Sequence, residues 1–166
     1  MRLYVMRHGP AEDRAPSGRD FDRRLTASGR ELVGRVARAF QAARGADPRS
    51  APSLQILTSP RVRARETAAI VRDAVVPAPD AIAIHEELGG ETAIPLALIA
   101  AAAAATGVDT LLVGHQPVVE ELVHQLVGKG AMHTGFSTAT IVGLDHAADG
   151  AGWTLVTHLD PSRLPG

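Results

Sequence analysis

The 166-residue sequence contains no cysteine. Without thiols the chain can form neither disulfide bonds nor metal centres with thiolate ligands. Its histidines are dispersed and its acidic residues follow no metal-ligand spacing, so we expect no metal and no other cofactor. The chemistry of the protein is therefore expected to come from its own side chains.

The chain also lacks an excess of either charge. It has 17 Lys and Arg against 18 Asp and Glu, which gives a formal net charge of -1. Such a balance provides no overall attraction to nucleic acid or to an anionic membrane, so we expect neither as a partner. Any site for an anionic ligand must be local.

Long apolar runs are missing as well. No segment reaches the roughly 18 apolar residues of a membrane-spanning helix, and the run over 3–6 is too short for the core of a signal peptide. We therefore expect a cytoplasmic protein. With 45% hydrophobic residues, the chain is expected to form a single domain, residues 1–166, around its own core.

The first motif present is the end of this N-terminal apolar run, where Arg7, His8 and Gly9 follow a predicted strand. In open α/β sheets the carboxyl ends of strands are where ligands bind. A neutral imidazole is a competent nucleophile, and a guanidinium offers a fork of donors that suits phosphate. The motif therefore indicates phosphoryl transfer onto His8. Taken alone, the same tripeptide is also compatible with an ordinary surface turn.

The rest of the chain alternates between short apolar runs and helical periodicities. After a polar loop over 11–24, we predict helices over 26–45, 60–76 and 94–106 and a further one from Pro117, strands over 54–58, 82–84 and 110–113, and a hairpin of strands over 137–144 and 153–159. Thr26 or Ser28 can cap the first helix. Ser59 is the predicted N-cap of the second. Strands that alternate with helices predict an α/β sheet covered on both faces.

Two more strand ends carry the same kind of residues as the first. Arg61, Arg63 and Arg65 follow the second strand, and because alternate helical residues point in different directions, only one can face back over the helix N-terminus. His115 follows the fourth strand. A parallel sheet brings the three ends to one edge, where two guanidinium groups and two imidazoles would surround a phosphoryl group.

Three motifs together resemble those of the histidine phosphatase superfamily: Arg7-His8-Gly9, Ser59-Pro60 with Arg63-Ala64 and Thr67, and Val113-Gly114-His115-Gln116-Pro117. The short chain and the segment over 20–26 are similar to the compact SixA-like branch, the phosphohistidine phosphatases. The resemblance extends over residues 2–159, nearly the whole chain. It implies a three-layer α/β/α sandwich with a mainly parallel sheet, as in phosphoglycerate mutase.

The resemblance also implies roles for individual residues. His8 is the expected nucleophile, Arg7 and Arg63 are expected to bind the phosphoryl oxygens, and His115 completes the pocket. We add Gly9, Ser59 and Asp20 to the expected substrate-binding residues; for Ser59 the favoured role is a helix cap, which its hydroxyl can combine with substrate binding. Cations around His8 should keep its ring neutral and nucleophilic near pH 7.

The general acid has two candidates. Glu87 matches the wider family better, and Asp20 is the competitor; the alternative is that either carboxylate only accepts a hydrogen bond from Arg7 or Arg23. A protonated imidazole leaves phosphorus with little help, whereas an alkoxide needs a proton donor. A phosphohistidine substrate would therefore tolerate the absence of an acid.

The span over 64–114 is too short for a large lid, and an open pocket suits a phosphoryl group on a protein surface. We therefore expect a phosphohistidine protein as substrate, such as a histidine phosphotransfer domain. A small-molecule phosphomonoesterase of the same family and a catalytically silent phosphate-binding module remain the alternatives. The sequence names neither the physiological partner nor the oligomeric state.

Overall fold

The computed structural model describes residues 2–75, 81–90, 94, 108–131, 135–147 and 152–164. Its centre is a six-stranded sheet in the order β3-β2-β4-β1-β5-β6. The strands are β1 (Arg2–Arg7), β2 (Ser53–Thr58), β3 (Ile82–Ile84), β4 (Val108–Gly114), β5 (Ile141–His146) and β6 (Trp153–Leu159). None of the helices in these ranges is long and apolar enough to cross a membrane.

The sheet is mainly parallel, as predicted. Strands β3, β2, β4 and β1 run in the same direction, whereas β5 is antiparallel to β1 and β6 is antiparallel to β5. β5 begins at Ile141 rather than at the predicted residue 137, because the preceding residues form a turn in which the Thr140 amide donates to the Ser137 carbonyl at 3.1 Å. Ala139 in this turn has a φ of 67°.

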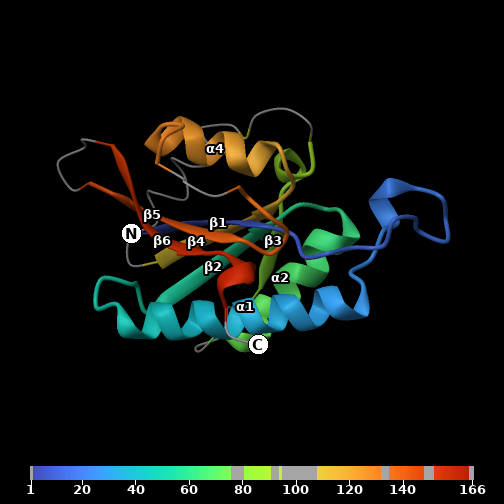
Figure 1. Ribbon diagram of the computed structural model, residues 1–166, viewed down its shortest axis with the longest axis horizontal. Helices are drawn as coiled ribbons and strands as arrows, with labels where there is room; N and C mark the ends of the chain where they lie inside the picture. Colours follow the sequence, from blue (N-terminus) through green and yellow to red (C-terminus); the bar gives the residue numbers. More distant parts are fainter. Residues whose placement is uncertain are drawn as a thin grey trace.

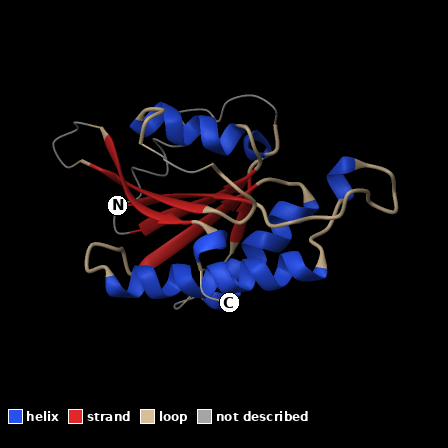
Figure 2. Ribbon diagram, in the orientation of Figure 1, coloured by secondary structure: helices blue, strands red, loops and turns tan. Residues whose placement is uncertain are grey.

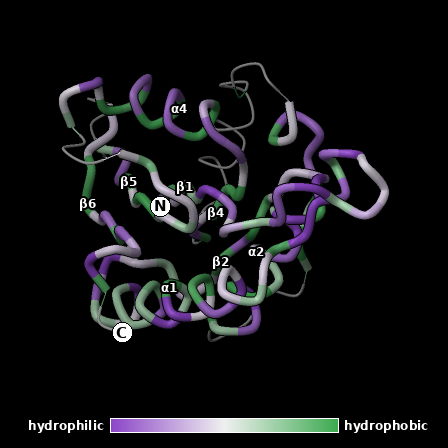
Figure 3. Tube along the Cα trace, turned by 45° about the vertical axis from the view of Figure 1, so that its right-hand side comes forward, coloured by the Kyte–Doolittle hydropathy of each residue, from purple (hydrophilic) through white to green (hydrophobic). Residues whose placement is uncertain are grey.

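Helices cover both faces of the sheet and complete the predicted three layers (Figures 1 and 2). α1 (Ala27–Ala46) and α2 (Val62–Ala74) lie on one face, and α4 (Val118–Val127) lies on the other. Residues alternate along β1, so Tyr4 and Met6 join the core under α1 and α2 while Leu3 and Val5 join the core under α4. Figure 3 shows hydrophobic and hydrophilic residues alternating along α4, as a helix with one buried face requires.

The first predicted cap is correct and the second is wrong. The Thr26 hydroxyl accepts a hydrogen bond from the Gly29 amide at 3.0 Å and caps α1. α2, however, begins at Val62 rather than at Pro60, and its N-cap is Arg61, whose side chain makes no capping bond. The cause is that Ser59 still belongs to the sheet edge: its amide donates to the Val113 carbonyl at 3.0 Å. The chain turns into the helix only after this bond.

The loop over 11–24 projects from the body of the molecule and contains the 3-10 helix η1 (Asp20–Asp22), as Figure 1 shows. Two further 3-10 helices, η2 (Glu86–Leu88) and η3 (Pro161–Arg163), follow β3 and β6. The helix predicted over 94–106 lies outside the described residues except for Ile94, which is buried.

Candidate active site

The ends of β1, β2 and β4 meet at one edge of the sheet and are joined by main-chain hydrogen bonds. The His8 amide donates to the Gly114 carbonyl at 3.0 Å, and its own carbonyl accepts from the Ala139 amide at 3.1 Å. The Gly9 amide donates to the Thr67 hydroxyl at 3.0 Å. The backbone on either side of His8 is therefore held by three different parts of the fold.

The ring of His8 has one protonated nitrogen and one nitrogen that accepts a hydrogen bond. Its Nδ1 lies 2.7 Å from the Gly9 carbonyl, an acceptor, so Nδ1 carries the proton. Its Nε2 accepts from Nε of Arg63 at 3.2 Å. Burial lowers the pKa of His8 to about 4; the Gly9 carbonyl opposes this shift, and nearby arginines, Arg63 first, reinforce it. The ring is neutral at pH 7, with burial a larger cause than the cations on which the sequence argument relied.

Arg63 extends from the first turn of α2 and is buried. Besides its bond to His8, it donates from Nη1 to the Asp20 carbonyl at 2.8 Å and from Nη2 to the Asp20 carboxylate at 3.0 Å. Burial lowers the pKa of Arg63, an effect that Asp20 opposes. The guanidinium is thus fixed in direction while it retains its charge.

His115 stands beside His8, with 4.9 Å between the ring centroids. Its Nε2 lies 2.7 Å from the Ser59 hydroxyl, which also accepts from the Arg61 amide at 3.2 Å. Burial lowers the pKa of His115 to about 3, with further lowering by His8 and Arg63. Ser59 therefore holds the second imidazole as well as ordering the entry to α2.

Arg7 completes the group from the end of β1. Its Nη1 donates to the Phe136 carbonyl at 3.0 Å, and burial lowers its pKa. Nε of Arg7 and Nδ1 of His115 are buried without a hydrogen-bond partner among the described residues. Buried polar atoms without a partner are rare in proteins, and a bound ligand is one way in which they are satisfied.

Two cavities open beside these residues and share Gln116 in their walls. One, of about 380 Å³, is lined by Arg61, Arg63 and His115; the other, of about 400 Å³, is lined by Arg7 and Asp160. Arg7 and Arg63, which the sequence analysis expected to bind the phosphoryl oxygens, thus line two different cavities that share Gln116. Together the cavities leave His8 close to an open cleft rather than under a lid of the described residues.

Asp20 is the residue on which three arginines converge. Its carboxylate accepts from Arg23 at 2.8 Å, from Arg63 at 3.0 Å and from Nη1 of Arg61. These bonds, first that of Arg23, hold the pKa of Asp20 well below its usual range. Sequence reasoning did not assign Arg61 or Arg23 to the site. The only signal for Arg61 was its place in the run of alternate arginines over 61–65.

Gly9 and Glu87 take different places in the structure. A side chain on Gly9 would collide with Val33 of α1, so only glycine allows the catalytic turn and this helix to pack together. Glu87 is half exposed in η2, with its carboxylate 3.8 Å from Nδ1 of His85. Among the described residues it makes no hydrogen bond to His8. The residues described include no group of histidines and carboxylates suited to a metal.

Comparison with known proteins agrees with this geometry. A family profile described as the histidine phosphatase superfamily (branch 1) matches residues 3–89. The chain belongs to this superfamily. An uncharacterized protein from Picosynechococcus sp. is 35% identical over 150 residues, 89% of this chain and 87% of that protein.

Two solved structures place this histidine phosphatase in the SixA-like branch. A protein assigned as the phosphohistidine phosphatase SixA from Agrobacterium tumefaciens has a TM-score of 0.77 and 29% identity, covering 96% of this chain and 97% of its own. The protein histidine phosphatase SixA in complex with tungstate has a TM-score of 0.76 and 25% identity, covering 98% of both chains. The chain is a phosphatase with the phosphoglycerate mutase-like fold.

Proposed function

We propose that this phosphatase removes the phosphoryl group from phosphohistidine in a protein, through a phosphohistidine intermediate on His8. The observation that carries the proposal is the arrangement of the His8 ring: Nδ1 is bonded to Gly9, and the neutral Nε2 lies beside a buried guanidinium. This is the state that a nitrogen nucleophile needs for attack on phosphorus.

In the first step, Nε2 of His8 forms a bond to phosphorus as the N–P bond of the substrate breaks. The other nitrogen of the leaving imidazole is protonated beforehand, so the imidazole takes the electron pair of that bond and leaves as a neutral ring. The Gly9 carbonyl, 2.7 Å from Nδ1, stabilises the positive charge that develops on the His8 ring. In the second step water attacks phosphorus, the Nε2–P bond breaks, and inorganic phosphate leaves.

Arg63 has to exchange partners during this cycle. In the resting structure its Nε–H covers the lone pair of His8, so an arriving phosphoryl group takes over this donor and frees Nε2 for attack. Arg7 offers its unpaired Nε to the same group from the other side. His115 supplies the third wall and is neutral at pH 7, which leaves one of its ring nitrogens able to donate to a phosphoryl oxygen.

The surroundings of the carboxylates favour a nitrogen leaving group. Asp20 is ionised at neutral pH and is bonded to arginines, so it orders these arginines and has no proton to give. Glu87 is half exposed and is paired with His85. An imidazole departs without a strong acid, whereas an alkoxide does not. Phosphohistidine is therefore the substrate class that this pocket serves best.

A panel of three substrates tests the proposal: phosphoramidate, a phosphohistidine peptide and a phosphoserine peptide. We expect turnover of the two N–P compounds at rates well above that of the phosphoserine peptide. Rapid alkaline quenching should trap an acid-labile phosphate on the wild type. His8→Ala should abolish both turnover and labelling, whereas His124→Ala on α4 should retain both.

Two outcomes would replace the proposal by its alternatives. Faster turnover of small phosphate esters than of the phosphohistidine peptide would indicate a small-molecule phosphomonoesterase. Binding of inorganic phosphate without turnover of any substrate would indicate a phosphate-binding module.

A further inference from the structure

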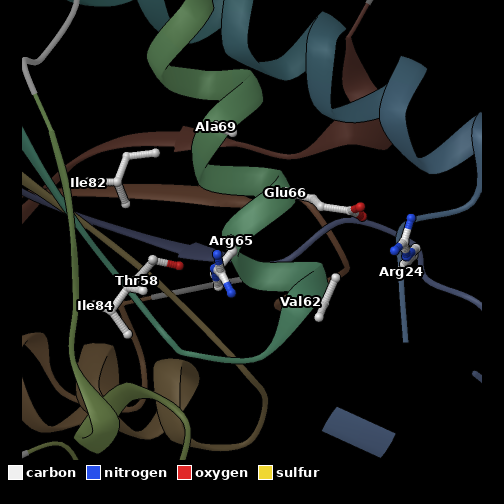
Figure 4. A pocket seen from close by; sticks show the side chains of 8 residues that line it. All are labelled: Arg24, Thr58, Val62, Arg65, Glu66, Ala69, Ile82 and Ile84. Atoms are coloured by element: carbon white, nitrogen blue, oxygen red, sulfur yellow. The ribbon is translucent and has the colours of Figure 1, made fainter. Parts of the chain in front are cut away.

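A third cavity lies beside α2 and β3 (Figure 4). Its volume is about 530 Å³, larger than the 380 Å³ of the cavity beside Arg63 and His115. We call it the α2–β3 groove, after the two elements that supply most of its walls. It is lined by Arg24, Thr58, Val62, Arg65, Glu66, Ala69, Ile82 and Ile84.

The groove carries unbalanced positive charge. Arg24 and Arg65 are exposed, and neither side chain has a carboxylate partner among the described residues. Glu66 is the acid in the lining, but its carboxylate already accepts from Arg30 at 2.6 Å and from the Leu25 amide at 2.8 Å. The groove therefore offers two guanidinium groups to an acidic ligand, in a chain with an overall net charge of -1.

Apolar side chains supply much of the remaining lining of the groove. Val62 and Ala69 line it from α2, and Ile82 and Ile84 line it from β3, the edge strand of the sheet. Ile84 is 50% exposed, and it and Phe21 are the two large hydrophobic side chains exposed among the described residues. Apolar surface beside unpaired charge is typical of a protein-binding site.

The groove is continuous with the catalytic cleft along the chain. Thr58 lines the groove, and the next residue, Ser59, holds His115. Val62 lines the groove between Arg61 and Arg63, which line the catalytic cavity. Residues one to three positions apart in the sequence therefore line the two sites, and such a length of chain spans at most about 10 Å. A protein whose phosphohistidine enters the cleft therefore has neighbouring residues at the groove.

We propose that the α2–β3 groove docks an acidic, partly apolar segment of the phosphorylated protein, about three to five residues from its phosphohistidine. The proposal rests on the function proposed above and adds how the protein substrate is selected. Arg24 and Arg65 bind carboxylates of this segment, and Ile84 covers its apolar side chains. An acidic segment is favoured over a basic one because the unpaired groups in the groove are guanidinium groups.

Peptides with one histidine, phosphorylated chemically with phosphoramidate, test this selection. The peptides of the first series carry two glutamates three to five positions from the phosphohistidine, and those of the second series carry two glutamines at the same positions. In each series one peptide has the two residues on the N-terminal side of the phosphohistidine and another has them on the C-terminal side. The measured quantity is the ratio of kcat/KM for the glutamate peptide to kcat/KM for the glutamine peptide. The rate of phosphoramidate turnover by each enzyme preparation is used to correct its peptide kinetics for the fraction of folded enzyme.

For the wild type we expect a ratio of about five on the favoured side, because each exposed Arg–carboxylate contact contributes modestly. High salt should reduce the ratio, since exposed pairs are screened. The double variant Arg24→Gln/Arg65→Gln should give a ratio near one. Arg38→Gln removes an exposed arginine of α1 outside the groove and should retain the wild-type ratio.

Equal kcat/KM for both peptides in the wild type would overturn the docking proposal while leaving phosphohistidine turnover in place. An unchanged ratio in the double variant would also overturn it, because the preference would then come from another surface. Absence of turnover of every phosphohistidine peptide, with phosphoramidate still hydrolysed, would overturn the proposed substrate class together with the docking site.

Discussion

Two arginine-rich regions of this phosphatase differ in what holds their side chains. In the cleft beside His8, Arg7 and Arg63 are at least partly buried and are fixed by hydrogen bonds to a carbonyl, to a carboxylate and to His8, the proposed nucleophile. In the α2–β3 groove, Arg24 and Arg65 are exposed. Donors fixed in advance stabilise a transition state, whereas mobile exposed donors add modest affinity that salt weakens. This difference distinguishes Arg7 and Arg63, proposed to act in catalysis, from Arg24 and Arg65, proposed to bind the protein substrate.

The largest effect on activity is expected when an arginine that is held by hydrogen bonds in the cleft is removed. Arg63→Ala should lower kcat/KM by about 10²- to 10³-fold on every substrate, phosphoramidate included, because it deletes a preorganised donor beside the nucleophile. Steady-state kinetics on phosphoramidate provide the measurement. Arg38→Ala is the matched control and should retain wild-type kinetics. A loss of less than tenfold for Arg63→Ala would mean that fixed position does not distinguish the two regions.

The pH dependence of the rate should distinguish histidines in a buried pocket from histidines on the surface. His8 and His115 have pKa values lowered by burial to about 4 and about 3, so both rings stay neutral as the pH falls from 8 to 5. Below pH 4 protonation of His8 should reduce the rate about tenfold per pH unit. Initial rates corrected for uncatalysed hydrolysis give the profile. A half-loss near pH 6.5 would contradict a buried, neutral His8.

The same shifts predict how stability responds to pH. In the unfolded chain these histidines bind protons near pH 6.5, whereas in the folded protein they do so only near pH 4 and 3. Protons therefore favour the unfolded state, and the free energy of unfolding should fall as the pH drops from 6.5 towards 4. Urea unfolding at pH 7 and pH 5 measures this loss, and His115→Gln should make it smaller.

A smaller effect is expected at Asp20, which is exposed yet bonded to buried Arg63. Asp20→Asn removes a negative charge beside the phosphoryl site and keeps an oxygen that accepts from the arginines. Inorganic phosphate should therefore inhibit about two- to fivefold more strongly, as measured by its inhibition constant. Asp22→Asn, in the same 3-10 helix but bonded to Ser17 and Arg19, should leave this constant unchanged. Weaker inhibition of the Asp20 variant by phosphate would show that Asp20 matters more for ordering the arginines than for repelling the phosphate.

The smallest effect is expected at Glu87. Glu87→Gln should change kcat on a phosphohistidine peptide by less than about twofold, because an imidazole leaving group needs no strong acid. Glu86→Gln, one residue earlier in η2, is the control for a change of surface charge. A decrease in kcat of tenfold or more that is confined to the Glu87 variant would establish this carboxylate as a proton donor and therefore as a catalytic residue.

Local patterns were sufficient for the parts of the site that lie at strand ends. His8 and His115 could be placed because each follows an apolar run, and a parallel sheet brings such ends together. The spacing left open which arginine of the run over 61–65 faces the site, and the family resemblance selected Arg63. The local contact of Asp20 with Arg23 was among the alternatives considered, whereas its contacts with Arg61 and Arg63 could not be predicted, since they join a loop to residues 41 and 43 positions away. Ser59 was misplaced as a helix cap for the same reason: its partners come from β4 and from His115.

The main-chain bonds around His8 bear on what happens after the phosphoryl group has been transferred. The amide and carbonyl of His8 and the amide of Gly9 are bound by β4, by the turn before β5 and by α2. In the proposed mechanism, loading and unloading of the ring change its charge and bulk while these bonds hold the polypeptide beneath it in register. The proposed turnover then needs movements of side chains and solvent around a main chain that stays in place.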